Sequence, residues 1–306
     1  MSNAAIAVQP AVHALEVHPV AGRIGAEIRG VQLSGELDAA TVDAIQQALL
    51  QYKVIFFREQ TQLDDQRQEA FAHLLGEPVA HPTVPVREGT RFLLELDGAE
   101  GQRASSWHTD VTFVEAYPKA SILRSVVAPA FGGDTLWANT ATAYEGLSTE
   151  LRELADKLVA VHSNEYDYAG TRPDVSAEKL ERYRKVFTST VYETEHPVVR
   201  VHPLSGEKSL LLGHFVKRIK GYSQADSAHL FGLLQSHVIR QENIVRWRWK
   251  AGDVAIWDNR STQHYAVDDY GTQDRIVRRV TLKGEVPVGV IGQVSKTVKG
   301  PDIGGV

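Results

Sequence analysis

SSWHTDVTF, residues 105–113, is the stretch from which the rest of the sequence is interpreted. Its tryptophan, valine and phenylalanine have the bulky, β-favouring character of a buried strand. His108 and Asp110 stand two residues apart within it. Because side chains alternate across a strand, positions i and i+2 project from the same face. The sequence therefore predicts a strand that directs an imidazole and a carboxylate toward one point.

The composition limits the classes of protein and of site. The chain has 306 residues, 43% of them hydrophobic, and a formal net charge of −5 from 33 Lys+Arg and 38 Asp+Glu. This mild negative charge argues against a nucleic-acid partner, which usually requires a basic face. The absence of cysteine excludes disulfides, thiolate metal ligands and cysteine nucleophiles.

No apolar run approaches the roughly 18 residues of a membrane span. The N-terminal stretch has no Lys or Arg before Arg23, and it lacks the pattern of a secretory signal. A cytoplasmic protein with no membrane partner is therefore expected.

Hydrophobic periodicity and turn residues predict the order of the elements. Helices are expected over 38–52, 64–75, 148–159 and 223–240, and early strands over 24–28 and 53–57. From 185 onward short strand patterns recur: VFTSTVY (186–192), PVVRVH (197–202), SLLL (209–212), VRWRW (245–249), DVAIWD (253–258) and RIVRRVTL (275–282). Short strands separated by Gly, Asp and Pro turns are typical of an antiparallel barrel or jelly roll.

The predicted organisation is a flexible tail over 1–14 followed by one domain over 15–306. Its fold class is α+β, mainly β, with a double-stranded β-helix (jelly-roll) core flanked by helices. The stretch 79–106 mixes prolines and glycines and is typical of a long irregular loop. Long loops in compact domains are often lids, so lid segments are expected near 82–106 and 166–182.

A metal that accepts imidazole and carboxylate together needs a third ligand beside the His-x-Asp pair. The best candidate is His264 in GDVAIWDNRSTQHYAVDDYG, 154 residues beyond Asp110 (264 − 110). Two histidines and one carboxylate on one face of a metal leave other positions open, as in non-haem Fe(II) oxygenases. Structural zinc sites, by contrast, are usually closed and four-coordinate.

The strand RIVRRVTL adds a second feature. Arg275, Val277 and Arg279 share one face of it, and Arg278 points the other way. Two guanidinium groups would then face the interior of a barrel, where buried cations without partners cost several kcal/mol each. No acidic residue nearby in the sequence obviously supplies both partners. Small dianionic ligands are therefore expected.

Together these motifs resemble the taurine dioxygenase/TfdA-type family of Fe(II)- and 2-oxoglutarate-dependent dioxygenases. The matching segments are WHTDVTF, GGDTLWAN, HPVVRVHPLSG, WDNRSTQHYAVDDYG and the R-x-x-x-R of RIVRR, in family order over roughly residues 15 to 285. Within that family the sequence is most similar to bacterial alkylsulfate dioxygenases, often called alkylsulfatases.

The resemblance implies roles at the metal and the cosubstrate. His108, Asp110 and His264 would be the iron ligands. Arg275 would grip the distal carboxylate of 2-oxoglutarate bidentately, a geometry that guanidinium suits. The hydroxyl of Thr135 would donate a hydrogen bond to the same carboxylate.

The resemblance also implies contacts to a sulfate group. Arg279 would lie between the cosubstrate and the sulfate of the primary substrate, and His81 and the backbone N–H of Val111 would be further sulfate contacts. Taurine-using relatives carry an asparagine four residues before the first iron histidine, where this chain has Ala104. A small apolar side chain offers nothing to an ammonium group and suits an alkyl chain.

The implied reaction consumes O2 and 2-oxoglutarate and gives succinate and CO2. Hydroxylation of the sulfate-bearing carbon of a medium-chain alkyl sulfate gives a hemiacetal-like sulfate, which collapses to aldehyde and sulfate. The resemblance also favours a homo-oligomer, a tetramer or a dimer.

Three alternatives stay open at this point. A hydrolytic sulfatase would need a C/S-x-P-x-R signature or dense histidine motifs, and neither is present. The same chemistry on taurine, another sulfonate or a phenoxyacetate would use the same arginines. A non-enzymatic barrel that senses an anion would release no CO2.

Overall fold

The computed structural model describes residues 15–100, 104–165 and 177–301. The helices are α1 (Ala39–Tyr52), α2 (Asp65–Leu75), α3 (Thr140–Glu145), α4 (Thr149–Ala155), α5 (Ala177–Phe187) and α6 (Gln224–Val238), with 3-10 turns η1 (Gly98–Glu100) and η2 (Gln241–Asn243). The first nine strands are β1 (Glu16–Pro19), β2 (Ala26–Arg29), β3 (Val54–Phe57), β4 (Pro78–Val79), β5 (Leu94–Asp97), β6 (Ala120–Val127), β7 (Thr135–Asn139), β8 (Val159–Ser163) and β9 (Glu193–Pro197). The others are β10 (Val199–Val201), β11 (Lys208–Leu210), β12 (Val216–Ile219), β13 (Ile244–Trp247), β14 (Val254–Asp258), β15 (Thr262–Ala266), β16 (Ile276–Leu282) and β17 (Lys296–Lys299).

The largest sheet joins strands from both halves of the chain. Its order is β1-β2-β3-β14-β6-β16-β4, with β5 also paired to β16, and its pairs are antiparallel except β2–β3. A three-stranded antiparallel sheet, β13-β7-β15, and a four-stranded one, β12-β8-β9-β17, accompany it. Strands β10 and β11 form a separate pair.

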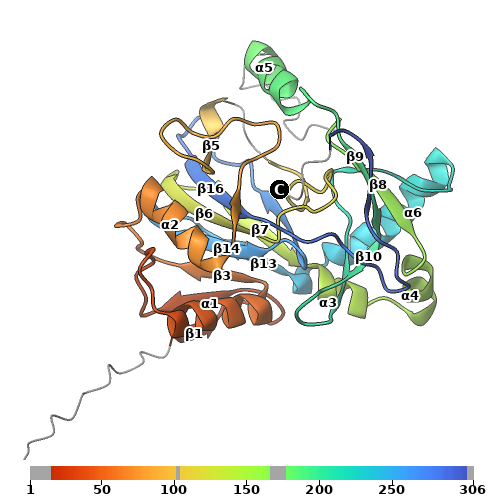
Figure 1. The fold of residues 1–306 in the computed structure, drawn as a ribbon, viewed down its shortest axis with the longest axis horizontal. Helices are drawn as coiled ribbons and strands as arrows, with labels where there is room; N and C mark the ends of the chain where they lie inside the picture. Colours follow the sequence, from red (N-terminus) through yellow and green to blue (C-terminus); the bar gives the residue numbers. More distant parts are fainter. Residues whose placement is uncertain (1–14, 101–103, 166–176, 302–306) are drawn as a thin grey trace, which may run out of the picture.

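The two faces of the large sheet pack against different partners, as β3 illustrates. Ile55 and Phe57 join a buried cluster with apolar residues of α1 and α2, and those helices lie along one side of the sheet in Figure 1. Val54 and Phe56 join a second cluster that includes Trp137 of β7 and other residues of the three-stranded sheet. A sheet buried on both faces in this way places the interior of the domain between the large and the three-stranded sheets.

The remaining helices lie away from α1 and α2. Figure 1 shows α3, α4 and α6 gathered beside β8 and β10, opposite the first two helices. Their apolar residues form a third cluster with residues of β8, β10 and β11. The mixed α+β character that the sequence predicts, with several antiparallel sheets, is confirmed.

The long helices are where the sequence predicts them. Asp38 caps α1 by accepting a hydrogen bond from the Thr41 N–H, and Asp64 caps α2 in the same way. Gly76 ends α2. The helix predicted over 223–240 is α6, with Ser223 as its N-cap.

Three segments differ from prediction. Residues 105–113 are not a strand: His108 makes a single bridge to His264, and the chain then turns. The segment 186–192 is not a strand either, because α5 runs to Phe187. The helix predicted to reach 159 ends at Ala155 and gives way to β8. In each case the bulky residues are buried as expected but by another conformation, since β propensity reports mainly fit to a half-buried surface.

The predicted lid segments are only partly described. Residues 82–100 are irregular except for β5, which pairs with β16, and for the turn η1. The tail 1–14 and residues 166–176 of the second lid lie outside the described residues. Among the helices of the described ranges, none has the length and apolarity needed to cross a bilayer.

Candidate active site

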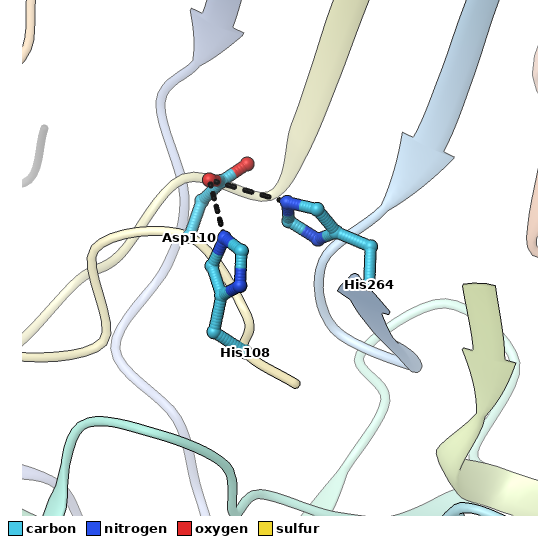
Figure 2. Close-up of side chains that lie close together, drawn as sticks. All are labelled: His108, Asp110 and His264. Atoms are coloured by element: carbon cyan, nitrogen blue, oxygen red, sulfur yellow. Dashed lines mark ion pairs between the residues drawn. The ribbon is translucent and has the colours of Figure 1, made fainter. Parts of the chain in front are cut away.

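The three predicted metal ligands lie together. His108, Asp110 and His264 are buried and each offers a ligand atom within 4.8 Å of the others. The Nε2 atoms of His108 and His264 lie 4.0 Å and 3.7 Å from the Asp110 Oδ1. Figure 2 shows both imidazoles pointing their edges at this carboxylate.

The backbone and the neighbouring groups fix the orientation of His108. Its N–H donates to the His264 carbonyl at 3.1 Å, and the His264 N–H donates to the His108 carbonyl at 2.8 Å. Its Nδ1 lies 2.7 Å from the Ser106 carbonyl, which can only accept, so Nδ1 carries the hydrogen and Nε2 keeps its lone pair. Gly213, at φ +106°, allows this close approach, because a Cβ there would lie 3.0 Å from the Trp107 carbonyl oxygen.

Asp110 is held by two donors on other elements. The Ser121 hydroxyl of β6 donates to Oδ2 at 2.7 Å, and Ser121 is itself held by the Asn259 amide at 3.0 Å. Arg279 of β16 donates to Oδ1. This ion pair corrects the expectation that no carboxylate partners the interior arginines; it joins residues 169 positions apart, so no local signal indicated it.

The protonation states of the trio suit a cation. Burial acts to raise the pKa of Asp110, but the charges of Arg279 and the two histidines outweigh it and hold the pKa well below its usual range. Burial lowers the pKa of His108 to about 4, which the attraction of Asp110 only partly offsets. Burial and the neighbouring His108 lower the pKa of His264 as well. Two neutral imidazoles beside an ionised carboxylate are the ligand state that divalent transition metals bind.

The alternation predicted along β16 is confirmed. Arg275 and Arg279 are 7% and 6% exposed and face the pocket. Arg278 faces the other way and pairs with Asp65 and Glu95, each at 2.8 Å.

Thr135 and Arg275 form a second polar cluster. The Arg275 Nε donates to the Gly133 carbonyl at 3.1 Å, and its Nη2 lies 3.4 Å from the Thr135 hydroxyl oxygen. Trp249 Nε1 also donates to that oxygen, at 2.9 Å. Because Thr135 accepts from both neighbours, its own hydroxyl hydrogen stays available for an anion.

One pocket brings most of the predicted residues together. Its polar lining is His108, His264, Thr135, Arg275 and Arg279, and its apolar lining is Leu96, Ala104, Leu123, Trp257, Ala266 and Val277. Ala104 therefore lines the same pocket as the two arginines. The combination of fixed cations with apolar walls suits an anion that carries a hydrocarbon part.

His81 and Val111 lie near this pocket without lining it. The His81 ring packs beside Phe113 and Phe187, and its Nδ1 accepts from the Val84 N–H at 3.0 Å, so Nε2 carries the hydrogen. Burial and the charge of Arg279 lower its pKa to about 3, which keeps the ring neutral. Val111 is buried, with the unusual φ of +57°.

Sequence reasoning missed the residues that support the trio and the arginines. Ser106, Ser121, Gly213 and Trp249 act only through contacts made by the folded chain. Trp249 carried a signal, because its alternation in VRWRW places it on the buried face. The other three gave none.

Comparison with known proteins is consistent with this geometry. The model of the taurine catabolism dioxygenase TauD, TfdA family matches residues 16–281. An alpha-ketoglutarate-dependent sulfate ester dioxygenase of Pseudomonas putida is 78% identical over 98% of this chain and 99% of its own length. An alkylsulfatase of Acinetobacter baylyi is 60% identical over 97% of this chain and 93% of its own.

A crystal structure of a putative alpha-ketoglutarate-dependent taurine dioxygenase from Burkholderia xenovorans superposes with a TM-score of 0.81 at 39% identity, covering 94% of this chain and all of that one. The family predicted from the motifs is thereby confirmed: the chain belongs to the taurine catabolism dioxygenase TauD/TfdA family.

Proposed function

We propose that this protein is an Fe(II)- and 2-oxoglutarate-dependent dioxygenase that oxidises the sulfate-bearing carbon of medium-chain alkyl sulfate esters. The observation that carries the proposal is the buried trio of His108, Asp110 and His264 beside two buried arginines in one pocket. The names of the two relatives, a sulfate ester dioxygenase and an alkylsulfatase, support the substrate class. The apolar Ala104 in the pocket wall supports an alkyl chain over a charged amine.

The core is proposed to be a double-stranded β-helix. Its support is the buried cluster between the large sheet and the β13-β7-β15 sheet, both built of antiparallel strands. The single domain, the cytoplasmic location and the homo-oligomeric state stay predictions.

Iron would be held by the Nε2 atoms of His108 and His264 and by the Asp110 carboxylate. The donor set fits, because all three groups are in the unprotonated ligand state and are oriented by other contacts. When bound, Fe(II) with 2-oxoglutarate and O2 supplies the oxidising power needed to hydroxylate an alkyl C–H bond.

Arg275 and Thr135 would bind the distal carboxylate of 2-oxoglutarate. Arg275 is held on one side by the Gly133 carbonyl, which directs its remaining donors. The Thr135 hydroxyl, which accepts from Trp249 and Arg275, would donate its hydrogen to the carboxylate. Hydrogen bonds to a charged group in a site shielded from water are worth about 1.5–3 kcal/mol each.

Arg279, His81 and the Val111 N–H would bind the sulfate. Arg279 Nε is buried, and no described residue accepts a hydrogen bond from it. The neutral His81 would donate from Nε2, since its Nδ1 already accepts from the chain.

The reaction balances as an oxidation in which sulfate is the leaving group. One oxygen atom of O2 enters succinate and the other becomes the hydroxyl on the sulfate-bearing carbon, with release of CO2 from 2-oxoglutarate. The hydroxylated ester then breaks its C–O bond to sulfate as the hydroxyl loses its proton, which leaves an aldehyde. The protein's part is to hold the sulfate so that this carbon faces the metal site.

The test is to measure succinate and sulfate release with hexyl sulfate, taurine and 2,4-dichlorophenoxyacetate, each with Fe(II), 2-oxoglutarate and air. Equimolar succinate, sulfate and hexanal are expected with hexyl sulfate. Sulfate release under anaerobic conditions without 2-oxoglutarate would instead indicate a hydrolytic sulfatase. Equal or faster turnover of taurine would overturn the proposed substrate class.

A further inference from the structure

The turn that carries Asp110 contains a strained residue. Val111 follows Asp110 directly at φ +57°, in the left-handed region that a β-branched side chain rarely adopts. Such a conformation persists only where the surrounding structure enforces it. The groups that hold the following two residues are therefore of interest.

Three buried side chains hold Thr112 and Phe113. His162 Nδ1 of β8 lies 2.9 Å from the Thr112 hydroxyl, and His196 Nε2 of β9 lies 2.7 Å from the Thr112 carbonyl. The Thr194 hydroxyl of β9 donates to the Phe113 carbonyl at 2.8 Å. We call His162, Thr194 and His196 the turn clamp; each of them is 0% exposed.

The C-terminal segment supports the turn clamp from behind. Because a carbonyl only accepts, His196 Nε2 carries the hydrogen and its Nδ1 accepts from the Ser295 hydroxyl at 2.6 Å. The His162 and His196 rings meet edge to face with centroids 4.9 Å apart. Residues far apart in the sequence thus converge on one turn with a single defined tautomer at His196.

We propose that the turn clamp consists of positioning residues that hold Val111 in its left-handed conformation and thereby set the sulfate-binding backbone N–H. The inference rests on the proposed function, in which this N–H contacts the sulfate. Among the described residues, none accepts a hydrogen bond from the Val111 N–H. Asp110 has its own contacts to Ser121 and Arg279, so the clamp acts on sulfate binding more than on the metal.

The experiment weakens the clamp with Thr194→Val, which keeps the shape and removes one donor. The Kd of hexyl sulfate is measured by titration calorimetry on the metal-free protein, and its KM is measured in turnover. Thr194→Val should raise both roughly 5- to 30-fold, while the Mn(II) Kd and the cosubstrate KM stay within about twofold. His196→Gln is a second variant of the same kind.

Two controls separate positioning from general stability. Thr194→Ser retains the hydroxyl and should bind hexyl sulfate as the unmodified protein does. Ser209→Ala removes another buried hydroxyl that donates to a carbonyl, that of Arg260 at 2.7 Å, and should leave sulfate affinity unchanged. An equal loss of hexyl sulfate, Mn(II) and 2-oxoglutarate affinity in Thr194→Val would overturn the inference.

A rescue tests the strain itself. Glycine adopts left-handed conformations without the steric cost, so Val111→Gly should cost less thermal stability in the Thr194→Val background than alone, and should restore part of its sulfate affinity. Additive effects on both would refute the clamp. Because the stability coupling needs no ligand, it judges the clamp even if the unmodified protein binds no alkyl sulfate, an outcome that would refute the proposed function separately.

Discussion

The pair formed by Arg279 and Asp110 makes a prediction that links stability to metal binding. Their side chains are 6% and 2% exposed, so removing the guanidinium leaves a carboxylate buried with reduced compensation. Breaking a buried pair in this way costs about 3–5 kcal/mol. Because Ser121 still donates to Asp110, we expect Arg279→Leu to lose about 3 kcal/mol, which is roughly 6 °C in Tm for a chain of this size.

A divalent cation should reverse much of this loss. In Arg279→Leu the cation supplies the charge that Asp110 lacks, and it meets no competing guanidinium. The rise in Tm on adding Mn(II), which resists oxidation, should therefore be larger in this variant than in the unmodified protein. Thermal unfolding followed by circular dichroism, with and without Mn(II), measures both quantities.

Arg278→Leu is the matched control. It lies on the same strand with its guanidinium on the opposite face, and its partners Asp65 and Glu95 are 21% and 30% exposed. Its loss should be about 1 kcal/mol and independent of Mn(II). The reasoning fails if Arg279→Leu loses the same stability with and without Mn(II), or if Arg278→Leu shows the same dependence on the metal.

Three further predictions concern the metal, the pH and the substrate. Asp110→Ala should abolish iron-dependent succinate formation while its far-ultraviolet circular dichroism stays unchanged; turnover retained in this variant would contradict the ligand assignment. Folded His196 stays neutral down to a pKa of about 3 because it is buried, whereas in the unfolded chain it gains a proton below about 6.5. The unfolded state then binds more protons, so the unfolding free energy should fall as pH drops from 6.5 to 5, by up to about 1.4 kcal/mol per pH unit for each such histidine. His196→Gln should flatten this decline, and replacement of the exposed His229 by Gln should not; equal slopes would argue against the buried histidine as its origin. Ala104→Asn should lower the turnover of hexyl sulfate relative to taurine, as measured by succinate release, and an unchanged ratio would remove Ala104 from the substrate argument.

Local sequence patterns predicted the elements whose causes are local. Helix α1 begins at a capping aspartate and buries a regular stripe, and both features stand in the sequence. The inward and outward arginines of β16 follow from alternation alone. The three ligands were found because the chemistry of the site needs those residue types.

What the sequence did not predict depends on contacts across the fold. The segment 105–113 has the pattern of a strand, yet its buried residues reach the core from a turn with a left-handed valine. The pairing of Arg279 with Asp110 spans 169 positions, and the support of Ser121 comes from a different sheet strand. Neither has a local pattern, because each depends on which strands the sheets bring together.

The two-sided arginine pattern of β16 also constrains how this strand can vary in length. Arg278 faces α2 and β5, and its neighbours at 275 and 279 face the pocket, within one stretch of ladder paired to β6. Deleting a single residue upstream of Arg275, while the ladder register of the following residues shifts by one, would turn two guanidiniums toward the helix layer and carry the third inward. Such a chain would have nearly the same composition and hydropathy as this one, and it would present one cation where two anions are meant to dock.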